Sequence, residues 1–217
     1  ELAAKDATLY DKACKELRTT QMRIRSSWYL LEERNDNGDP DVIDWEALRQ
    51  GDTGIVHDEF LMLQALTQRG VKLLFAAWRF PYWMCGRPAD WNPGNRDRPP
   101  LPLEMEAEFV ESLVAYFLLA RERYGVTFEA ISISNEPNLP IYIGGLDPRR
   151  LAAITLALKQ RLAQHDYKAK FYGPDVTGMI PRWVQRYLDE GGAGVSCSVA
   201  FHSYNRNTDG LKAYRAL

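Results

Sequence analysis

The chain has 217 residues, of which 46% are hydrophobic and 12% aromatic, a composition that suits one packed core and excludes a disordered chain. Its 27 lysines and arginines nearly balance its 29 aspartates and glutamates, which predicts no nucleic-acid surface and no polybasic membrane patch. No apolar run approaches the roughly 18 residues of a membrane helix. The cysteines, Cys14, Cys85 and Cys197, lie far apart and predict neither a disulfide framework nor a zinc site.

Predicted helices and predicted strands alternate along the chain. The first predicted helix, over 3–17, carries Leu9, Ala13 and Leu17 on one face. A second predicted helix begins after its N-cap, Asp58. The helices after the first are predicted over 59–69, over 104–124, from Asp147 and Pro148 onward, over 183–188 and from Asp209. In the helix over 104–124, a solvated face is predicted for Glu104, Glu106, Glu108 and Glu111.

Five short apolar or alternating segments predict strands between these helices. They lie at 22–25, 71–77, 130–134, 169–172 and 195–201. Helical crossovers between strands predict parallel pairing in an α/β fold, either an open doubly wound sheet or a closed eightfold barrel. No glycine-rich phosphate-binding loop follows a strand, which disfavours the open nucleotide-binding sheet.

Polar and aromatic residues gather directly after the predicted strands, which is where a barrel builds its active site. They lie at 25–28, 78–83, 135–138, Asp175 and 202–205. A complete (β/α)8 barrel usually needs about 250 residues. The sequence therefore predicts a partial barrel.

The string ISISNEPN at 131–138 carries the clearest chemical signal. A buried strand would deliver Asn135 and Glu136 to the barrel mouth, and Pro137 would end the strand because it lacks a backbone donor. A carboxylic acid beside an amide that can bond a sugar hydroxyl suits a general acid for glycosidic bonds. From these residues alone, an arginine-paired Glu136 and a turn-capping Asn135 are an equally good interpretation.

This string resembles the acid/base motif at the end of strand 4 in retaining glycoside hydrolases with eightfold barrels. The neighbouring segments most resemble glycoside hydrolase family 30, the group of glucosylceramidases, β-1,6-glucanases and xylanases. FAAWRFPYWMCG at 75–86 is similar to the tryptophan- and proline-rich segment after strand 3, although Ala76, Arg79, Phe80, Tyr82 and Cys85 depart from its usual residues. FHSYN at 201–205 resembles the segment after strand 6, and MRIRSSWY at 22–29 resembles the end of strand 2.

The resemblance implies that the five strands are strands 2 to 6 of the barrel and that residues 1–217 form an incomplete TIM-barrel catalytic domain. It implies that Glu136 is the acid/base and Asn135 binds the sugar 2-hydroxyl. Trp78 would form a wall of the sugar subsite, His202 and Tyr204 would line the site, and Arg25 would keep the nucleophile ionised. We expect that nucleophile to be a glutamate at the end of strand 7, which would lie beyond Leu217. Strands 1, 7 and 8 are thus expected to be absent from this chain.

The implied activity is retaining hydrolysis of β-linked glucan, xylan or glucoside substrates, and the chain alone is expected to be inactive. A family 5 type endoglucanase and a carbohydrate-binding pseudoenzyme are the alternatives. The mechanism requires no metal or cofactor. The sequence leaves open the sugar, endo or exo action and the oligomeric state, while the resemblance implies a secreted or extracytoplasmic protein. Arg25 could also form an ordinary ion pair, His202 could be a core histidine, and Asp175 could belong to a proline-aspartate turn.

Overall fold

The computed structural model describes residues 7–88, 91, 99–140, 143, 145–178, 180–204 and 212. The helix predicted from Asp209 and the first residues of the helix predicted over 3–17 fall outside these ranges, apart from residue 212. The described residues form an α/β structure built on one parallel sheet.

The sheet has five strands in the order in which they occur along the chain. Each strand pairs in parallel with the next, so the carboxyl ends of all five strands meet at one edge of the sheet. The fourth strand runs further than predicted, to Thr177, and the fifth begins later than predicted because a helical turn occupies 193–195. The strands are β1 (Gln21–Arg25), β2 (Lys72–Ala76), β3 (Ala130–Ser132), β4 (Lys170–Thr177) and β5 (Ser198–His202).

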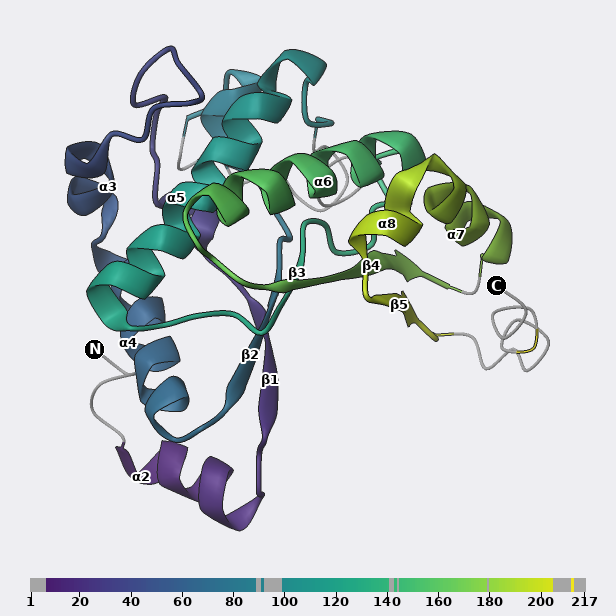
Figure 1. The fold of residues 1–217 in the computed structure, drawn as a ribbon. Helices are drawn as coiled ribbons and strands as arrows, with labels where there is room; N and C mark the ends of the chain where they lie inside the picture. The colour runs from purple at the N-terminus through teal and green to yellow at the C-terminus, as the bar shows by residue number, and fades with distance from the viewer. Residues whose placement is uncertain are drawn as a thin grey trace.

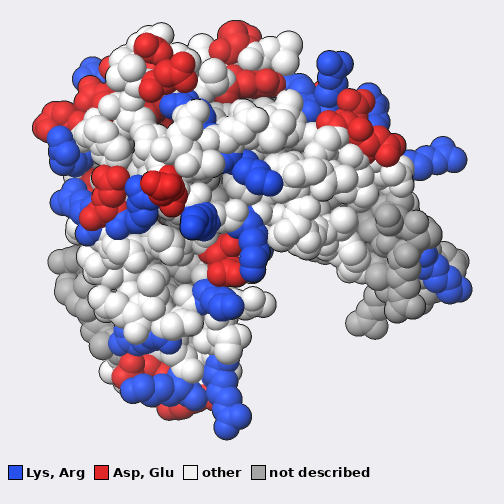
Figure 2. Space-filling view, in the orientation of Figure 1, with Lys and Arg blue, Asp and Glu red and all other residues white. Residues whose placement is uncertain are grey.

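The helices cover one face of this sheet. They follow one another around its outside, from α4 through α5 and α6 to α7 and α8, and no helix of the described residues covers the opposite face (Figure 1). Figure 2 shows the surface hollowed on this uncovered side, with acidic and basic side chains meeting at the bend. The helices are α2 (Ala7–Asp11), α3 (Trp45–Gly51), α4 (Gly54–Gln68), α5 (Glu106–Tyr124), α6 (Pro148–Gln164), α7 (Pro181–Tyr187) and α8 (Ala193–Val195).

Short turns of other helix types complete the described structure. They are the π-helices η1 (Lys12–Glu16) and η5 (Leu188–Gly192) and the 3-10 helices η2 (Trp28–Leu30), η3 (Tyr82–Cys85) and η4 (Leu103–Met105).

The core lies between the sheet and α5. Phe75 of β2 packs edge-on against Phe117 of α5, with ring centroids 4.8 Å apart, and against Phe128 at 5.6 Å. In the same cluster, the ring of Tyr116 of α5 lies 5.7 Å from Phe75 and stacks on Phe60 of α4 at 5.1 Å. Such aromatic pairs bury much apolar surface in fixed geometries, so they hold β2 and β3 firmly against the helices.

The structure confirms some predicted helix ends and corrects one. The side chain of Asp147 caps α6 by accepting hydrogen bonds from the backbone N–H groups of Arg149 and Arg150, and Gly125 ends α5 with a φ of 66°. The prediction for α4 was wrong, because the helix begins at Gly54 after Thr53 and so contains Asp58. The turn before Asp58, from Gly54 to His57, is helical as well, so an N-cap residue type alone does not show where a helix begins.

Two predicted helix faces were also wrong. Leu9 and Leu17 are 61% and 79% exposed, and Tyr10 and Cys14 pack against the core instead, because the segment continues as a π-helix that changes the repeat. In α5, Glu111 is only 1% exposed, although its spacing from the other acids predicted a solvated position. This helix is buried on nearly every side, so charge does not identify an exposed face there.

Candidate active site

The carboxyl ends of four strands bring five polar side chains together. Arg23 comes from β1, Asn135 and Glu136 follow β3, Asp175 lies in β4, and His202 ends β5. Side chains alternate along a strand, so Arg23 faces away from Ile24, which is buried in the core under the helices. The five groups therefore meet on the face that the helices leave uncovered.

His202 joins two of these carboxyl groups. Its Nδ1 lies 2.6 Å from Oε1 of Glu136, and its Nε2 lies 3.0 Å from Oδ1 of Asp175. The hydrogen bond with Asp175 is the main cause of a raised pKa for His202, and Glu136 adds to it, while partial burial opposes the rise. The site therefore favours a charged imidazolium between two acids.

Arg23 holds the other oxygen of Asp175. Its Nη2 donates to Oδ2 of Asp175 at 2.6 Å and to Oδ1 of Asn135 at 2.8 Å, and its Nε donates to the hydroxyl of Tyr172 at 3.3 Å. Burial is the largest single influence and lowers the pKa of Arg23, but the charge of Asp175 and the contacts with Tyr172 together outweigh it, so the pKa is raised. Arg23 thus links Asp175 to the residue that precedes Glu136.

Asn135 is fully buried and has one unused donor. Its backbone N–H bonds to the carbonyl of Ala77 at 2.7 Å, and its side-chain oxygen accepts from Arg23. Its Nδ2 has no hydrogen-bond partner among the described residues. Buried donors are nearly always paired in folded proteins, so this amide is poised to bind a group outside the described structure.

Glu136 and Asp175 both have backbone conformations that residues other than glycine rarely adopt. Their φ angles are 50° and 59°, and the N–H of Glu136 donates to the carbonyl of Asp175 at 2.9 Å. A left-handed conformation costs about 1–2 kcal/mol for such residues. Strain of this kind gathers at functional sites, where it turns a side chain in a direction that a regular strand does not allow.

Solved structures with a similar fold were found. A family 30 endoxylanase from Clostridium papyrosolvens C71 matches at a TM-score of 0.65 and 15% identity, with 97% of this chain and 50% of that chain covered. A family 30 subfamily 8 xylanase from Clostridium acetobutylicum matches at a TM-score of 0.66 and 18% identity, with 95% of this chain and 48% of that chain covered. The endo-β-1,6-glucanase BT3312 matches at a TM-score of 0.65 and 16% identity, with 98% of this chain and 50% of that chain covered. The chain is therefore similar in fold to about half of a family 30 glycoside hydrolase.

The predicted fold, about strands 2 to 6 of a (β/α)8 barrel, is therefore confirmed. The chain spans about half the length of these three structures. No protein-family model and no curated protein matches it. At these identities the likeness shows a similar fold alone.

The remaining predicted site residues lie around the same barrel mouth. The guanidinium carbons of Arg25 and Arg23 lie 4.9 Å and 5.8 Å from the ring centroid of Trp78. The hydroxyl of Tyr204 lies 3.2 Å from Nδ1 of His202, and Tyr204 is 70% exposed. All six predicted residues thus lie near the carboxyl ends of the strands, where Arg25 packs against Trp78.

Sequence reasoning missed Arg23 and left Asp175 undecided. The two-residue repeat of a strand was the signal for Arg23, because residues two apart lie on the same face. Arg23 therefore shares a face of β1 with Arg25, which was predicted to be in the site. Asp175 follows the same rule as Glu136, since both lie where a barrel strand reaches the active-site edge.

Neither a metal cluster nor a membrane-spanning helix occurs in the part of the chain that the structure describes. No three His, Cys, Asp or Glu side chains gather there as metal ligands. No described helix combines the length and apolar character needed to cross a membrane.

Proposed function

We propose that the protein containing this chain is a retaining glycoside hydrolase that cleaves β-linked glucan, xylan or glucoside substrates, with Glu136 as its acid/base. The contact between Glu136 and His202, beside the unpaired amide of buried Asn135, carries this proposal. The names of the similar structures, two xylanases and an endo-β-1,6-glucanase, support the choice of β-linked substrates.

In the proposed reaction, protonated Glu136 gives its proton to the glycosidic oxygen as the bond to the sugar breaks. The carboxylate that remains on Glu136 then lies 2.6 Å from the His202 imidazole, whose positive charge would stabilise it. In the second step Glu136 takes a proton from the water that releases the sugar from the enzyme. Asp175 supports the first step by favouring the charged form of His202, which stabilises the carboxylate that proton transfer leaves on Glu136.

A retaining mechanism also needs a nucleophilic carboxylate about 5–5.5 Å from the acid. Asp175 is the other described acid at the site, and its two oxygens are engaged by Arg23 and His202. This pairing suits a positioning role better than nucleophilic attack. We therefore propose that the nucleophile is a glutamate at the end of barrel strand 7, outside residues 1–217.

The remaining site residues have binding roles in the proposal. Nδ2 of Asn135 would donate to the sugar 2-hydroxyl, and the indole of Trp78 would form a wall of the sugar subsite. Tyr204 would line the site beside His202. Arg25 would hold the nucleophile in its ionised form, a role that its place near the barrel mouth allows.

The test is Glu136→Ala in the full-length protein, assayed on substrates that differ in their leaving group. Loss of a general acid should slow hydrolysis of oligosaccharides by about 10²–10⁴-fold. Activated aryl glycosides, whose leaving groups need little protonation, should lose much less. Glu104→Ala, at an exposed position in η4, is the matched control and should retain both activities.

Equal losses on both substrate types would overturn the acid/base role of Glu136. Robust turnover by residues 1–217 alone would overturn the assignment of the nucleophile to another part of the protein. Binding of oligosaccharides without turnover by the full-length protein would favour a carbohydrate-binding pseudoenzyme instead.

A further inference from the structure

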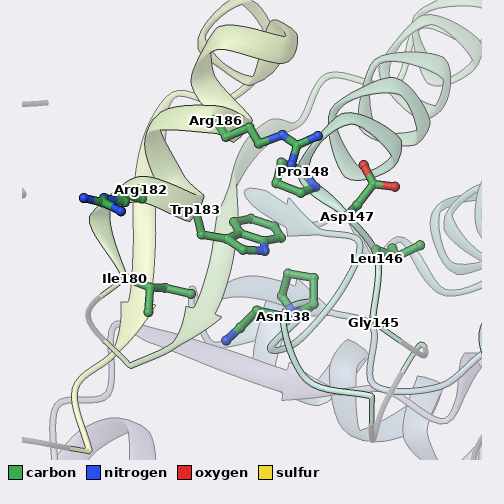
Figure 3. A pocket seen from close by; sticks show the side chains of 10 residues that line it. Asn138, Gly145, Leu146, Asp147, Pro148, Ile180, Arg182, Trp183 and Arg186 are labelled. Carbon is green, nitrogen blue, oxygen red and sulfur yellow. The ribbon is translucent and has the colours of Figure 1, made fainter.

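A pocket of about 640 Å³ lies beside the candidate active site, and none of the roles proposed above uses it. It is an open pocket bordered by the loop after β3, the start of α6 and the helix α7 (Figure 3). The residues that define its chemistry are Asn138, Leu146, Pro148, Arg182, Trp183 and Arg186.

One wall of the pocket belongs to the loop that carries Glu136. Pro137 and Asn138, the next two residues, both line it. The side chain of Asn138 is fixed to the end of β4, because its Oδ1 accepts from the N–H of Thr177 at 2.9 Å and its Nδ2 donates to the carbonyl of Thr177 at 3.2 Å. This wall therefore keeps a constant position relative to the proposed acid/base.

The opposite wall offers a flat aromatic surface. In Figure 3 the indole of Trp183 lies in the middle of the pocket, between Arg186 and Asn138. One side of the indole stacks on Tyr187, at 6.5 Å between centroids and 17° between planes, which fixes its orientation. The C–H groups of a sugar ring pack well on such an indole surface.

Hydrogen-bond donors at the pocket come from arginine. Arg182 and Arg186 are exposed, and neither forms an ion pair within the described ranges. Figure 3 shows the guanidinium of Arg186 reaching toward Pro148, whereas Arg182 points away. A guanidinium has five N–H donors, so Arg186 can bind several sugar hydroxyls at once.

We propose that this pocket is a subsite for a sugar unit on the leaving-group side of the scissile bond. Trp183 is its stacking platform and Arg186 its hydrogen-bond donor. This inference rests on the proposed function, because Glu136 gives its proton to the leaving-group oxygen. The residues directly after Glu136 therefore border the part of the substrate that departs.

The test compares two substrates that share the sugar to be transferred and differ in the leaving group. One is a xylo-oligosaccharide or β-1,6-gluco-oligosaccharide that extends into the pocket, and the other is the corresponding nitrophenyl glycoside. In the full-length protein, Trp183→Ala should lower the ratio of kcat/KM for the oligosaccharide to that for the aryl glycoside by about fivefold to tenfold.

Two further variants separate binding from folding. Trp183 also packs against the core, so Arg186→Ala, at an exposed position, tests the same pocket without changing the core. It should lower the ratio by about threefold to tenfold. Arg49→Ala, which removes an exposed arginine of α3, is the matched control and should leave the ratio unchanged.

Calorimetry with xylohexaose and a β-1,6-linked glucohexaose distinguishes failure of the pocket from failure of the proposed function. If the protein hydrolyses neither sugar, yet binds one and loses affinity in both pocket variants, the sugar subsite stands and the hydrolase proposal fails. An unchanged substrate ratio in both pocket variants overturns the subsite while leaving the hydrolase proposal intact. Absence of binding to the wild-type protein overturns the subsite.

Discussion

The carboxyl of Asp175 holds the imidazole of His202 on the side opposite Glu136, with 3.0 Å between Oδ1 and Nε2. A neutral imidazole has one donor nitrogen, so it could satisfy only one of its two acidic neighbours. A charged imidazolium donates to both. This geometry explains why the pKa of His202 is raised, first by Asp175 and then by Glu136.

Asp175→Asn should lower the pKa of His202, because it removes the largest contribution to the rise. NMR titration of the His202 imidazole protons in both proteins measures this directly. If activity requires the imidazolium, kcat/KM falls as pH rises through the His202 pKa, so the basic limb of the profile should move to lower pH in the variant. An unchanged titration of His202 would contradict this prediction.

Arg23 and Arg25 should differ in their effect on stability. Arg23→Met removes the donors to Asp175 and Asn135 and leaves a buried carboxylate short of a partner. The Arg23 side chain is 33% exposed, so we expect the moderate loss of about 1–3 kcal/mol in the free energy of unfolding. Arg25→Met removes a contact with Trp78 and should cost about 0.5–1 kcal/mol. Urea denaturation of both variants measures the difference, and equal losses would argue against the network around Arg23.

Glu111 should make the fold less stable as pH rises. Burial, and then the nearby charge of Glu32, raise the pKa of Glu111 to about 9, and its Oε1 has no hydrogen-bond partner in the described structure. Above about pH 5 the unfolded chain loses this proton while the folded chain keeps it, so stability falls up to about pH 9.

Glu111→Gln should therefore raise the free energy of unfolding at about pH 8 by about 1–3 kcal/mol, with little change at about pH 5. Denaturant titrations at the two pH values measure this. Glu104→Gln, at an exposed position, is the control and should show no such pH dependence. A gain of equal size at both pH values would rule out the titration of Glu111 as its cause.

Gly51 should tolerate no side chain. A Cβ at this position would collide with the backbone carbonyl oxygen of Leu31, and backbone atoms cannot move aside as a flexible side chain can. Gly51→Ala should therefore lower the free energy of unfolding by about 1–3 kcal/mol. Gly38→Ala, where a Cβ meets nothing within 4 Å, should change it by less than about 0.5 kcal/mol. Thermal denaturation of the two variants would show whether they differ.

The sequence predicted the strand order and the barrel class because crossover helices and buried apolar strands follow local rules. Arg23 shows the limit of that reasoning. Its position on the inner face follows from the strand period, but its contacts with Asp175 and Asn135 depend on how three strands are aligned. That alignment is a property of the assembled sheet.

Glu111 illustrates a second limit. Its neighbours in sequence are acidic, and local patterning treats such a run as one solvated face. The actual burial depends on what packs against α5 from other parts of the chain. Likewise, the pocket at Trp183 is lined by residues from three separate segments, so no single stretch of sequence predicts it.

The left-handed backbones of Glu136 and Asp175 have a consequence for laboratory evolution. Glycine or asparagine would adopt these conformations with less strain, but Asp175 also pairs with Arg23, so a library selected only for heat resistance should enrich glycine and asparagine at position 136 and keep Asp175. A library selected for sugar release should keep the two acids. Comparing the survivors of the two selections would separate what the chain needs in order to fold from what its chemistry demands.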